Sequence, residues 1–210
     1  MKFLQYLFIS LSHKILKLLP YTSIRILSVP IGTLYFLLTF RSSIKLFRRK
    51  EIFNELKINY KPLIVKINYT RYWLETLWLT NKNFSKYISP HVEIENLEYV
   101  EKLKKQYPGL IFALPHLGNW EFAIPIGNSI KLNLLAVAEP LNNSYVLNWF
   151  KSLRESLGIE IIIGGKGQNT FDLLVNKLKS GKDICLLSER SIKKSGVATK
   201  FFGQLAASPK

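Results

Sequence analysis

A histidine and a glutamate are separated by four residues inside an apolar stretch, residues 110–125, LIFALPHLGNWEFAIP. On one continuous α-helix, side chains five positions apart point about 140° away from each other and do not meet. We therefore expect His116 on a loop that Gly118 allows to turn, with a helix beginning after it. Asn119 is then the expected N-cap, and Glu121 falls in the first helical turn, from which it reaches back toward the imidazole.

This spacing suits proton transfer by a histidine. A carboxylate that accepts a hydrogen bond from one ring nitrogen fixes the tautomer of His116 and leaves the other nitrogen as a general base. Backbone N–H groups at the start of the helix are donors for an oxyanion or a phosphate. The pattern differs from the His-Glu-x-x-His of zinc proteases, and the sequence offers no Cys or His cluster for a metal site. A helix-capping glutamate beside a histidine bonded to backbone is the purely structural alternative, and it stays open at this stage.

Strands and helices alternate along the chain and must position this loop. Apolar runs of strand length occupy residues 110–115, 132–140, 159–165 and 182–189. Helical patterns occupy residues 54–78, 96–109, 118–130, 142–157 and 170–180, a short strand is expected at 91–96, and a strand or loop at 197–209. We expect an α/β fold with a mostly parallel central sheet flanked by helices. Loops 115–121, 164–168 and 188–191 then share one sheet edge, where chemistry gathers in such folds.

The first 45 residues are predicted to form a membrane-associated helical segment, with the α/β core in residues 46–210. The apolar stretch 26–40 is shorter than the ~20 residues of a spanning helix and contains Pro30. We therefore favour two helices that lie in one leaflet of a membrane. A single tilted span and a helical hairpin packed on the core of the protein are the alternatives.

The chain is strongly basic, with 30 Lys and Arg against 14 Asp and Glu and a formal charge of +16. Such a surplus predicts an anionic partner: a membrane, an acidic protein or a nucleic acid. Five cations between positions 41 and 50 directly follow the apolar segment, as is typical of a juxtamembrane segment on anionic lipid, although a solvated helix face is the alternative. The remaining cations are spread along the chain without a nucleic-acid-binding motif, so nucleic acid is not an expected partner. The single Cys185 forms no internal disulfide and is expected to be a small buried hydrophobe.

The hexapeptide HLGNWE resembles the His-x4-Asp/Glu block of the lysophospholipid acyltransferase superfamily. It is most similar to the lipid A late (lauroyl and myristoyl) acyltransferases and their relatives that acylate phosphatidylinositol mannosides. The closing stretch GVATKFFGQLAASP, residues 196–209, is similar to a Gly-Val…Phe-Phe-Gly…Ala…Pro stretch of that family. Arg154 falls where the family has an arginine ahead of a glycine, and Ser188-Glu189-Arg190 stands in place of an aspartate pair. Members usually continue with further helices, so we expect this chain to be shortened at its C-terminal end.

The resemblance implies a membrane-bound enzyme of the cytoplasmic face of the bacterial inner membrane. It would move a fatty acyl chain from a thioester, on acyl carrier protein or coenzyme A, to a hydroxyl of a lipid A precursor or a related phosphorylated glycolipid. His116 would be the general base and Glu121 its orienting partner. The candidate substrate-binding residues are Asn119, Arg154, Glu189 and Arg190, of which Arg154 would hold a phosphate of the acceptor or the phosphopantetheine of the donor. No cofactor or enzyme nucleophile is expected, because the thioester is already activated. The alternative is an inactive, shortened relative that acts as a basic membrane-binding protein.

Overall fold

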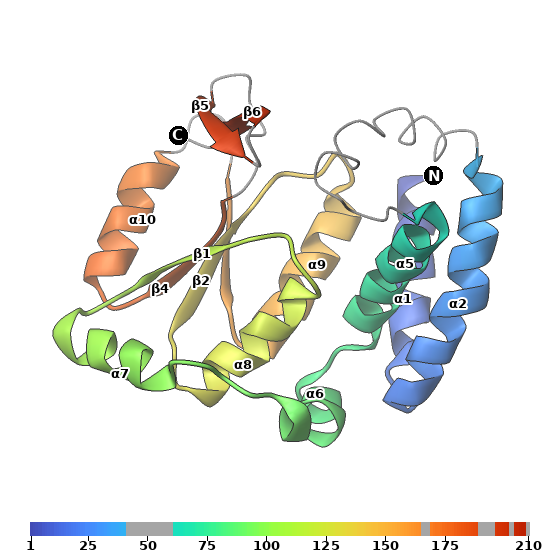
Figure 1. Cartoon of the computed structure of the whole chain (residues 1–210), viewed down its shortest axis with the longest axis horizontal. Coiled ribbons are helices and arrows are strands. Elements are labelled where there is room, and N and C mark those ends of the chain that lie inside the picture. Colours follow the sequence, from blue (N-terminus) through green and yellow to red (C-terminus); the bar gives the residue numbers. More distant parts are fainter. Residues whose placement is uncertain (41–60, 165–168, 189–195, 202–203, 209–210) are drawn as a thin grey trace.

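The computed structural model describes residues 1–40, 61–164, 169–188, 196–201 and 204–208. Within these residues, four strands form a parallel sheet with helices on both sides, and two further strands form a separate hairpin (Figure 1). The predicted α/β fold, with a mostly parallel central sheet flanked by helices, is confirmed.

The sheet contains β1 (Ile111–Leu114), β2 (Leu134–Ala138), β3 (Glu160–Ile163) and β4 (Asp183–Leu187), in the order β1-β4-β2-β3. All of its neighbouring strands are parallel. Their carboxyl ends therefore meet at one edge, and the segments that follow β1, β3 and β4 start there, as the sequence predicted.

Helices cover the sheet on both sides. Helices α8 (Ala123–Ser129) and α9 (Ser144–Leu157) lie on one side, and α10 (Thr170–Lys179) lies on the other (Figure 1). The connections from β1 to β2 and from β2 to β3 advance across the sheet, whereas the connection from β3 to β4 returns. Because such crossovers are right-handed, the returning one places its helix on the opposite face.

Helices α9 and α10 begin and end close to the predicted boundaries, and local side chains cap their ends. Asn143 and Asn169 are the N-caps of α9 and α10, and their side-chain oxygens accept from the N–H groups of Val146 and Asp172. Gly158 ends α9 with a φ of 102°, a conformation that side chains with a Cβ rarely adopt.

The short strand predicted at residues 91–96 is wrong. The described chain there leaves a 3-10 turn, η1 (Ser89–His91), and runs to Asn96, which precedes α7 (Leu97–Gln106) with a φ of 55°. Pro90 lacks a backbone donor and the left-handed Asn96 ends the extended stretch, so few residues remain for pairing with a sheet. Its apolar alternation has another cause, because Val92 packs against the hydrophobic core.

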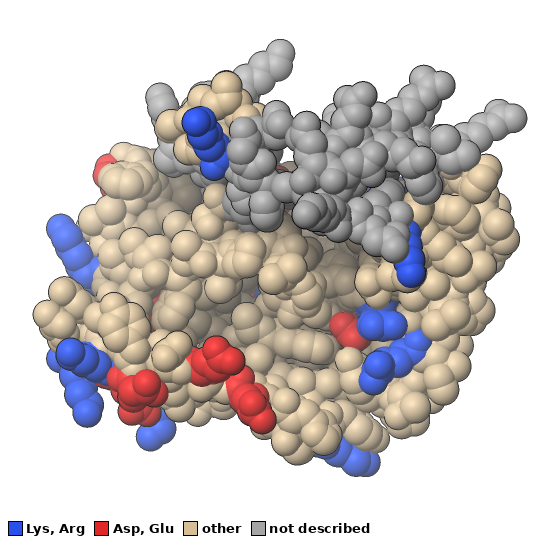
Figure 2. Space-filling model, in the orientation of Figure 1, with Lys and Arg blue, Asp and Glu red and all other residues tan. Residues whose placement is uncertain are grey.

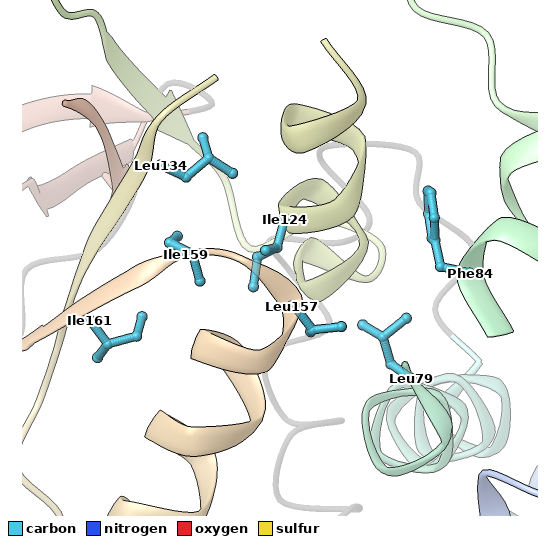
Figure 3. Close-up of a cluster of buried hydrophobic side chains, with 7 residues drawn as sticks. All are labelled: Leu79, Phe84, Ile124, Leu134, Leu157, Ile159 and Ile161. Carbon is cyan, nitrogen blue, oxygen red and sulfur yellow. The ribbon is translucent and has the colours of Figure 1, made fainter. Parts of the chain in front are cut away.

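The core fills the space between the sheet and the helices on the α8 and α9 side. Figure 3 shows side chains from different elements that point toward one another: Leu79, Phe84, Ile124, Leu134, Leu157, Ile159 and Ile161. Burying an aliphatic side chain of this size stabilises a fold by about 1.5–3 kcal/mol. This cluster therefore holds the helix that follows the His116 loop against β2 and β3.

A buried carboxylate holds the opposite edge of the sheet. Asp183, at the start of β4, has no exposed surface and accepts from Lys104 Nζ at 2.8 Å. It also accepts from the backbone N–H groups of Leu110 at 3.0 Å and Asn133 at 2.8 Å, which precede β1 and β2. One side chain thus joins the starts of three neighbouring strands, far from the edge where the candidate site lies.

Three helices form a separate layer beside the sheet, namely α1 (Lys2–Leu16), α2 (Tyr21–Leu38) and α5 (Pro62–Trp78), and α6 (Asn81–Tyr87) follows (Figure 1). Helix α2 packs closely on α5, because a Cβ at Gly32 would stand 2.6 Å from the Cα of Ile67. The indole of Trp78 donates to the carbonyl of Leu19 at 2.8 Å. The N-terminal helices are therefore docked on the protein, while their outer faces remain exposed.

The outer faces of α1 and α2 are apolar. Their exposed side chains include Phe3, Leu4, Phe8, Leu11, Leu18, Ile26, Leu34 and Leu37. In Figure 2 the flank over α2 is largely free of charged side chains. By length and composition alone, α2 is apolar enough to cross a membrane. The five predicted juxtamembrane cations between positions 41 and 50 lie outside the described residues.

Two short strands, β5 (Val197–Phe201) and β6 (Gln204–Ser208), form an antiparallel hairpin. The strand alternative for residues 197–209 is therefore correct for the described part of this stretch. In Figure 1 the hairpin lies at the upper end of the molecule, above the sheet.

Candidate active site

His116 lies on the loop that leaves the carboxyl end of β1, as predicted. The N–H of Leu117 donates to the carbonyl of Pro115 at 2.8 Å, and Gly118 has a φ of 63°, so the chain turns sharply behind the histidine. The imidazole is half-buried and meets the ring of Trp120 edge to face, with centroids 4.7 Å apart.

Asn119 caps the turn that follows. Its side-chain oxygen accepts from the backbone N–H of Glu121 at 3.1 Å, which confirms the predicted N-cap. The helix begins as a 3-10 turn, η2 (Trp120–Phe122), and continues as α8. Glu121 therefore lies in the first helical turn after the loop.

The Glu121 carboxylate is buried against Arg154 of α9. Arg154 donates from Nη2 to Oε1 at 2.6 Å and from Nε to Oε2 at 3.0 Å, while Glu121 is 2% exposed. Two charges removed from water are stable only in a close, hydrogen-bonded pair, and this two-pronged geometry supplies one. Phe150, one turn earlier on α9, supports the guanidinium with its ring centroid 5.5 Å from Cζ.

The surroundings keep the Arg154 guanidinium charged and the Tyr72 hydroxyl protonated. Burial opposes the charge of Arg154, but the hydrogen bonds and negative charge of Glu121 raise the pKa of the guanidinium above its ordinary value. Burial, followed by the charge of Glu121, raises the pKa of Tyr72, so its hydroxyl stays protonated and donates to Glu121 Oε1 at 3.4 Å. An arginine and a phenol therefore both bind the carboxylate.

These contacts bear on the predicted roles of two residues. The sequence predicted that Glu121 orients His116, yet both carboxylate oxygens contact Arg154, and no hydrogen bond between these described residues joins Glu121 to the imidazole. Arg154 was predicted to bind a substrate phosphate, and its guanidinium instead contacts a buried carboxylate. An indirect role for Glu121, through the loop that carries His116, and a substrate role for Arg154 both stay predictions.

Sequence reasoning missed a second buried carboxylate, Glu75 of α5. Its Oε1 accepts from the hydroxyl of Tyr21 at 2.8 Å, and its Oε2 accepts from the side-chain amide of Asn119 at 2.9 Å. Glu75 thus connects α2, α5 and the His116 loop. The available signal was an acidic residue inside the aromatic stripe YTRYWLETLW, where burial demands partners.

The first of two cavities beside the histidine is mostly aliphatic. This aliphatic cavity has a volume of about 250 Å³ and is lined by residues of β1 to β4, α8 and α9, including Arg154, and by His116 and Glu121. Its aliphatic wall includes Ile124 and Leu134, which Figure 3 shows pointing into the core. It therefore offers a hydrocarbon environment next to polar groups, as ligand sites typically do.

The second, polar cavity lies between α5 and the His116 loop. It has a volume of about 470 Å³. Its lining residues are Asn68, Tyr69, Arg71, Tyr72, Glu75, His116, Gly118, Asn119 and Trp120. His116 and Trp120 line both cavities, so the imidazole stands at the boundary between them.

Two of the predicted substrate-binding residues, Glu189 and Arg190, lie outside the described residues, as does the loop 165–168. The described neighbours fix where these segments begin. The N–H of Ser188 donates to the carbonyl of Leu114 at 3.1 Å, and that of Gly164 donates to the carbonyl of Ala138 at 2.9 Å. Both segments therefore leave the sheet at the same edge as the His116 loop.

Comparison with known proteins identifies the family. The sequence profile of the bacterial lipid A biosynthesis acyltransferases matches residues 2–210, which is nearly the whole chain. The chain belongs to the bacterial lipid A biosynthesis acyltransferase family. The family resemblance carried by HLGNWE and the closing stretch is therefore confirmed.

Curated relatives of this family member include phosphatidylinositol mannoside acyltransferases. That of Mycolicibacterium smegmatis is 30% identical over 146 residues, or 68% of this chain and 47% of the relative. That of Mycobacterium tuberculosis is 30% identical over 145 residues, or 68% of this chain and 46% of the relative. The chain spans about half the length of the curated relatives that it matches.

Proposed function

We propose that this chain transfers a fatty acyl group from a thioester to a hydroxyl of a membrane glycolipid, with His116 as the general base. The observation that supports this most is the position of His116. Its imidazole lies at the carboxyl edge of a parallel sheet and lines an aliphatic cavity, in a chain that belongs to a family of acyltransferases. Parallel α/β sheets bind their ligands at this edge.

The chemistry follows from a base placed between two cavities. The acyl chain lies in the aliphatic cavity, and the acceptor hydroxyl approaches from the polar cavity. His116 removes the hydroxyl proton as the oxygen attacks the thioester carbonyl, the C–O bond forms and the C–S bond breaks. The imidazolium returns the proton to the departing thiolate. A well-placed general base contributes about 10²–10⁴-fold to such a reaction.

The surrounding residues suit direct transfer without an acyl-enzyme. Cys185 lines the aliphatic cavity, but burial, followed by the charge of Asp183, raises the pKa of its thiol to about 11. The thiol is therefore protonated and a poor nucleophile at neutral pH. In this proposal the pair formed by Glu121 and Arg154 fixes the start of α8, and Asn119 fixes the loop through its contacts with Glu121 and Glu75.

The substrates follow from family and charge. The donor is a thioester of acyl carrier protein or coenzyme A, and both are anionic, as expected for a chain of +16. The acceptor is a phosphorylated glycolipid, either a lipid A precursor or a phosphatidylinositol mannoside, as the names of the relatives indicate. Glu189 and Arg190 follow β4 at the same edge and are proposed to contact the acceptor.

The N-terminal layer supports attachment to a membrane. The exposed apolar faces of α1 and α2 insert into one leaflet, and the cations at 41–50 interact with anionic headgroups. We propose that the protein is located at the cytoplasmic face of the bacterial inner membrane, where acyl thioesters are available. Residues 1–45 are the proposed membrane-associated segment, and residues 46–210 are the proposed α/β core.

The test is acyl transfer by purified protein with His116→Ala. We expect at least a hundredfold loss of kcat, from the usual contribution of a general base. His91→Ala is the matched control, because His91 is exposed on η1 and lines neither cavity described above. Wild-type turnover by His116→Ala would remove the histidine from the mechanism. Wild-type protein that binds anionic vesicles but transfers no acyl group would instead support the inactive membrane-binding alternative.

A further inference from the structure

Arg71 is the cation that faces the polar cavity from α5. The side chain is partly buried, and its Nε is fully enclosed without a hydrogen-bond partner. Among the described side chains, it is the one for which the structure shows such a buried, unsatisfied atom. Buried donors normally have partners, so the unsatisfied Nε shows that the described residues do not satisfy the whole of this guanidinium, and the Arg71 side chain lines the polar cavity.

The other arginine beside His116 has a different role. Arg154 lines the aliphatic cavity and contacts both oxygens of Glu121, so its charge is neutralised inside the protein. Arg71 forms no ion pair with the described carboxylates within 4 Å, including Glu75 on its own helix. Of these two guanidinium groups, Arg71 is the one that remains available to an anion.

The charges around the polar cavity permit an anion there. Glu75 is the carboxylate in its lining, and both of its oxygens already accept hydrogen bonds, from Tyr21 and Asn119. Asn68, Gly118 and Asn119 also line this cavity. A guanidinium without an ion pair to a described carboxylate can therefore bind an anion without displacing Glu75 from its partners.

We propose that the polar cavity is a phosphate-binding subsite in which Arg71 holds a phosphoryl group of one substrate while its reacting atoms lie at His116. This inference rests on the proposed function and assigns the phosphate role to Arg71 in place of Arg154. The phosphate belongs either to the headgroup of the acceptor lipid or to the phosphopantetheine arm of the donor. Both present the same phosphoryl oxygens to an arginine.

A binding measurement distinguishes the two sources without requiring turnover. The probes are pantetheine 4′-phosphate for the donor and glucosamine 1-phosphate for the acceptor, each compared with its unphosphorylated form by ligand-observed NMR on the full chain. We expect one of the phosphorylated probes to bind at least tenfold more tightly than its unphosphorylated form. Arg71→Gln should abolish that difference, and Arg71→Lys should keep most of it, because the charge remains.

Arg25→Gln is the matched control. Arg25 is exposed on α2 and, like Arg71, acts electrostatically on Tyr21, but it does not line the polar cavity. We expect it to leave probe affinity unchanged. Equal loss in Arg25→Gln and Arg71→Gln would show a diffuse charge effect and overturn the proposal, as would equal binding of phosphorylated and unphosphorylated probes to the wild-type protein.

Steady-state kinetics provide a second measurement. Arg71→Gln should raise the KM of the phosphate-bearing substrate tenfold or more while kcat changes less than threefold, the pattern of a binding residue. A fall in kcat with unchanged KM would overturn the assignment. If the wild-type protein transfers no acyl group, the proposed function is refuted but the phosphate subsite is not. Phosphate binding does not depend on turnover, and it can be measured in the wild-type protein and in His116→Ala, both of which retain Arg71.

Discussion

Replacing Arg154 by alanine tests the buried pair at the candidate active site. Removing one partner of a buried ion pair costs about 3–5 kcal/mol, because the other charge stays buried and uncompensated. Glu121 is 2% exposed and the Arg154 side chain is 25% exposed, so solvent reaches only one partner. We therefore expect the lower end, a loss of about 3 kcal/mol in the free energy of unfolding. For a chain of this size, that lowers Tm by roughly 6–12 °C.

The assay is thermal unfolding of the purified protein, with three matched variants. Glu121→Gln combined with Arg154→Ala should recover roughly 1–2 kcal/mol relative to Arg154→Ala, because no unpaired charge is then left buried. Arg154→Lys should lie between wild type and alanine, because it keeps the charge but loses the two-pronged contact. Lys151→Ala on the same helix removes an exposed pair with Glu155 and should change stability by about 1 kcal/mol or less.

Arg154→Ala should also lower the kcat of the proposed acyl transfer. Glu121 follows the His116 loop directly, so a displaced carboxylate moves the turn that carries the general base. A wild-type Tm in Arg154→Ala, or a double variant that melts no higher than the single one, would refute this account of the pair. A raised KM for a phosphorylated substrate with unchanged Tm and kcat would return Arg154 to a phosphate-binding role.

Three further predictions concern parts of the fold described above. Asp183→Asn should cost about 3 kcal/mol in chemical denaturation, because it removes a fully buried carboxylate that accepts from Lys104 and from the N–H groups of Leu110 and Asn133; a change below about 1 kcal/mol would contradict this. Gly32→Val should separate α2 from α5 and make the N-terminal helices sensitive to limited proteolysis, because a Cβ there stands 2.6 Å from Ile67; unchanged digestion would argue against close packing. Cys185, with its pKa raised to about 11, should react with iodoacetamide at pH 8 roughly a hundredfold more slowly than an unperturbed thiol, and the rate should rise as pH approaches 11 because the thiolate then forms; rapid labelling at pH 8 would contradict this.

The elements of the sheet were predictable because each carries its own local signal. Apolar runs of strand length alternate with capped helices, and Asn143, Asn169 and Gly158 mark boundaries through contacts within a few residues. The segment 91–96, wrongly predicted as a strand, alternates apolar and polar residues, but among the described residues it pairs with no strand. Alternation reports which side chains face the core, as Val92 does, and strand pairing depends on residues distant in the sequence.

The candidate site was predictable only in part. The placement of His116, Gly118 and Asn119 follows from spacing and from the conformational needs of a tight turn. The partner of Glu121 does not, because Arg154 is 33 residues away on another helix, and the pairing depends on how α8 and α9 pack. No local pattern reports such a contact, so the Glu121 carboxylate was assigned to the nearest donor in the sequence, the imidazole of His116.

Glu75 connects the N-terminal helices to the candidate active site through two hydrogen bonds. One of its oxygens is held by Tyr21, near the start of α2, and the other by Asn119, next to the turn of the His116 loop. A detergent that separates α2 from α5 would therefore also remove the hydrogen bond from Tyr21 to Glu75. If the proposed function holds, acyl transfer lost during extraction should then return when added lipid restores the contact between α2 and α5.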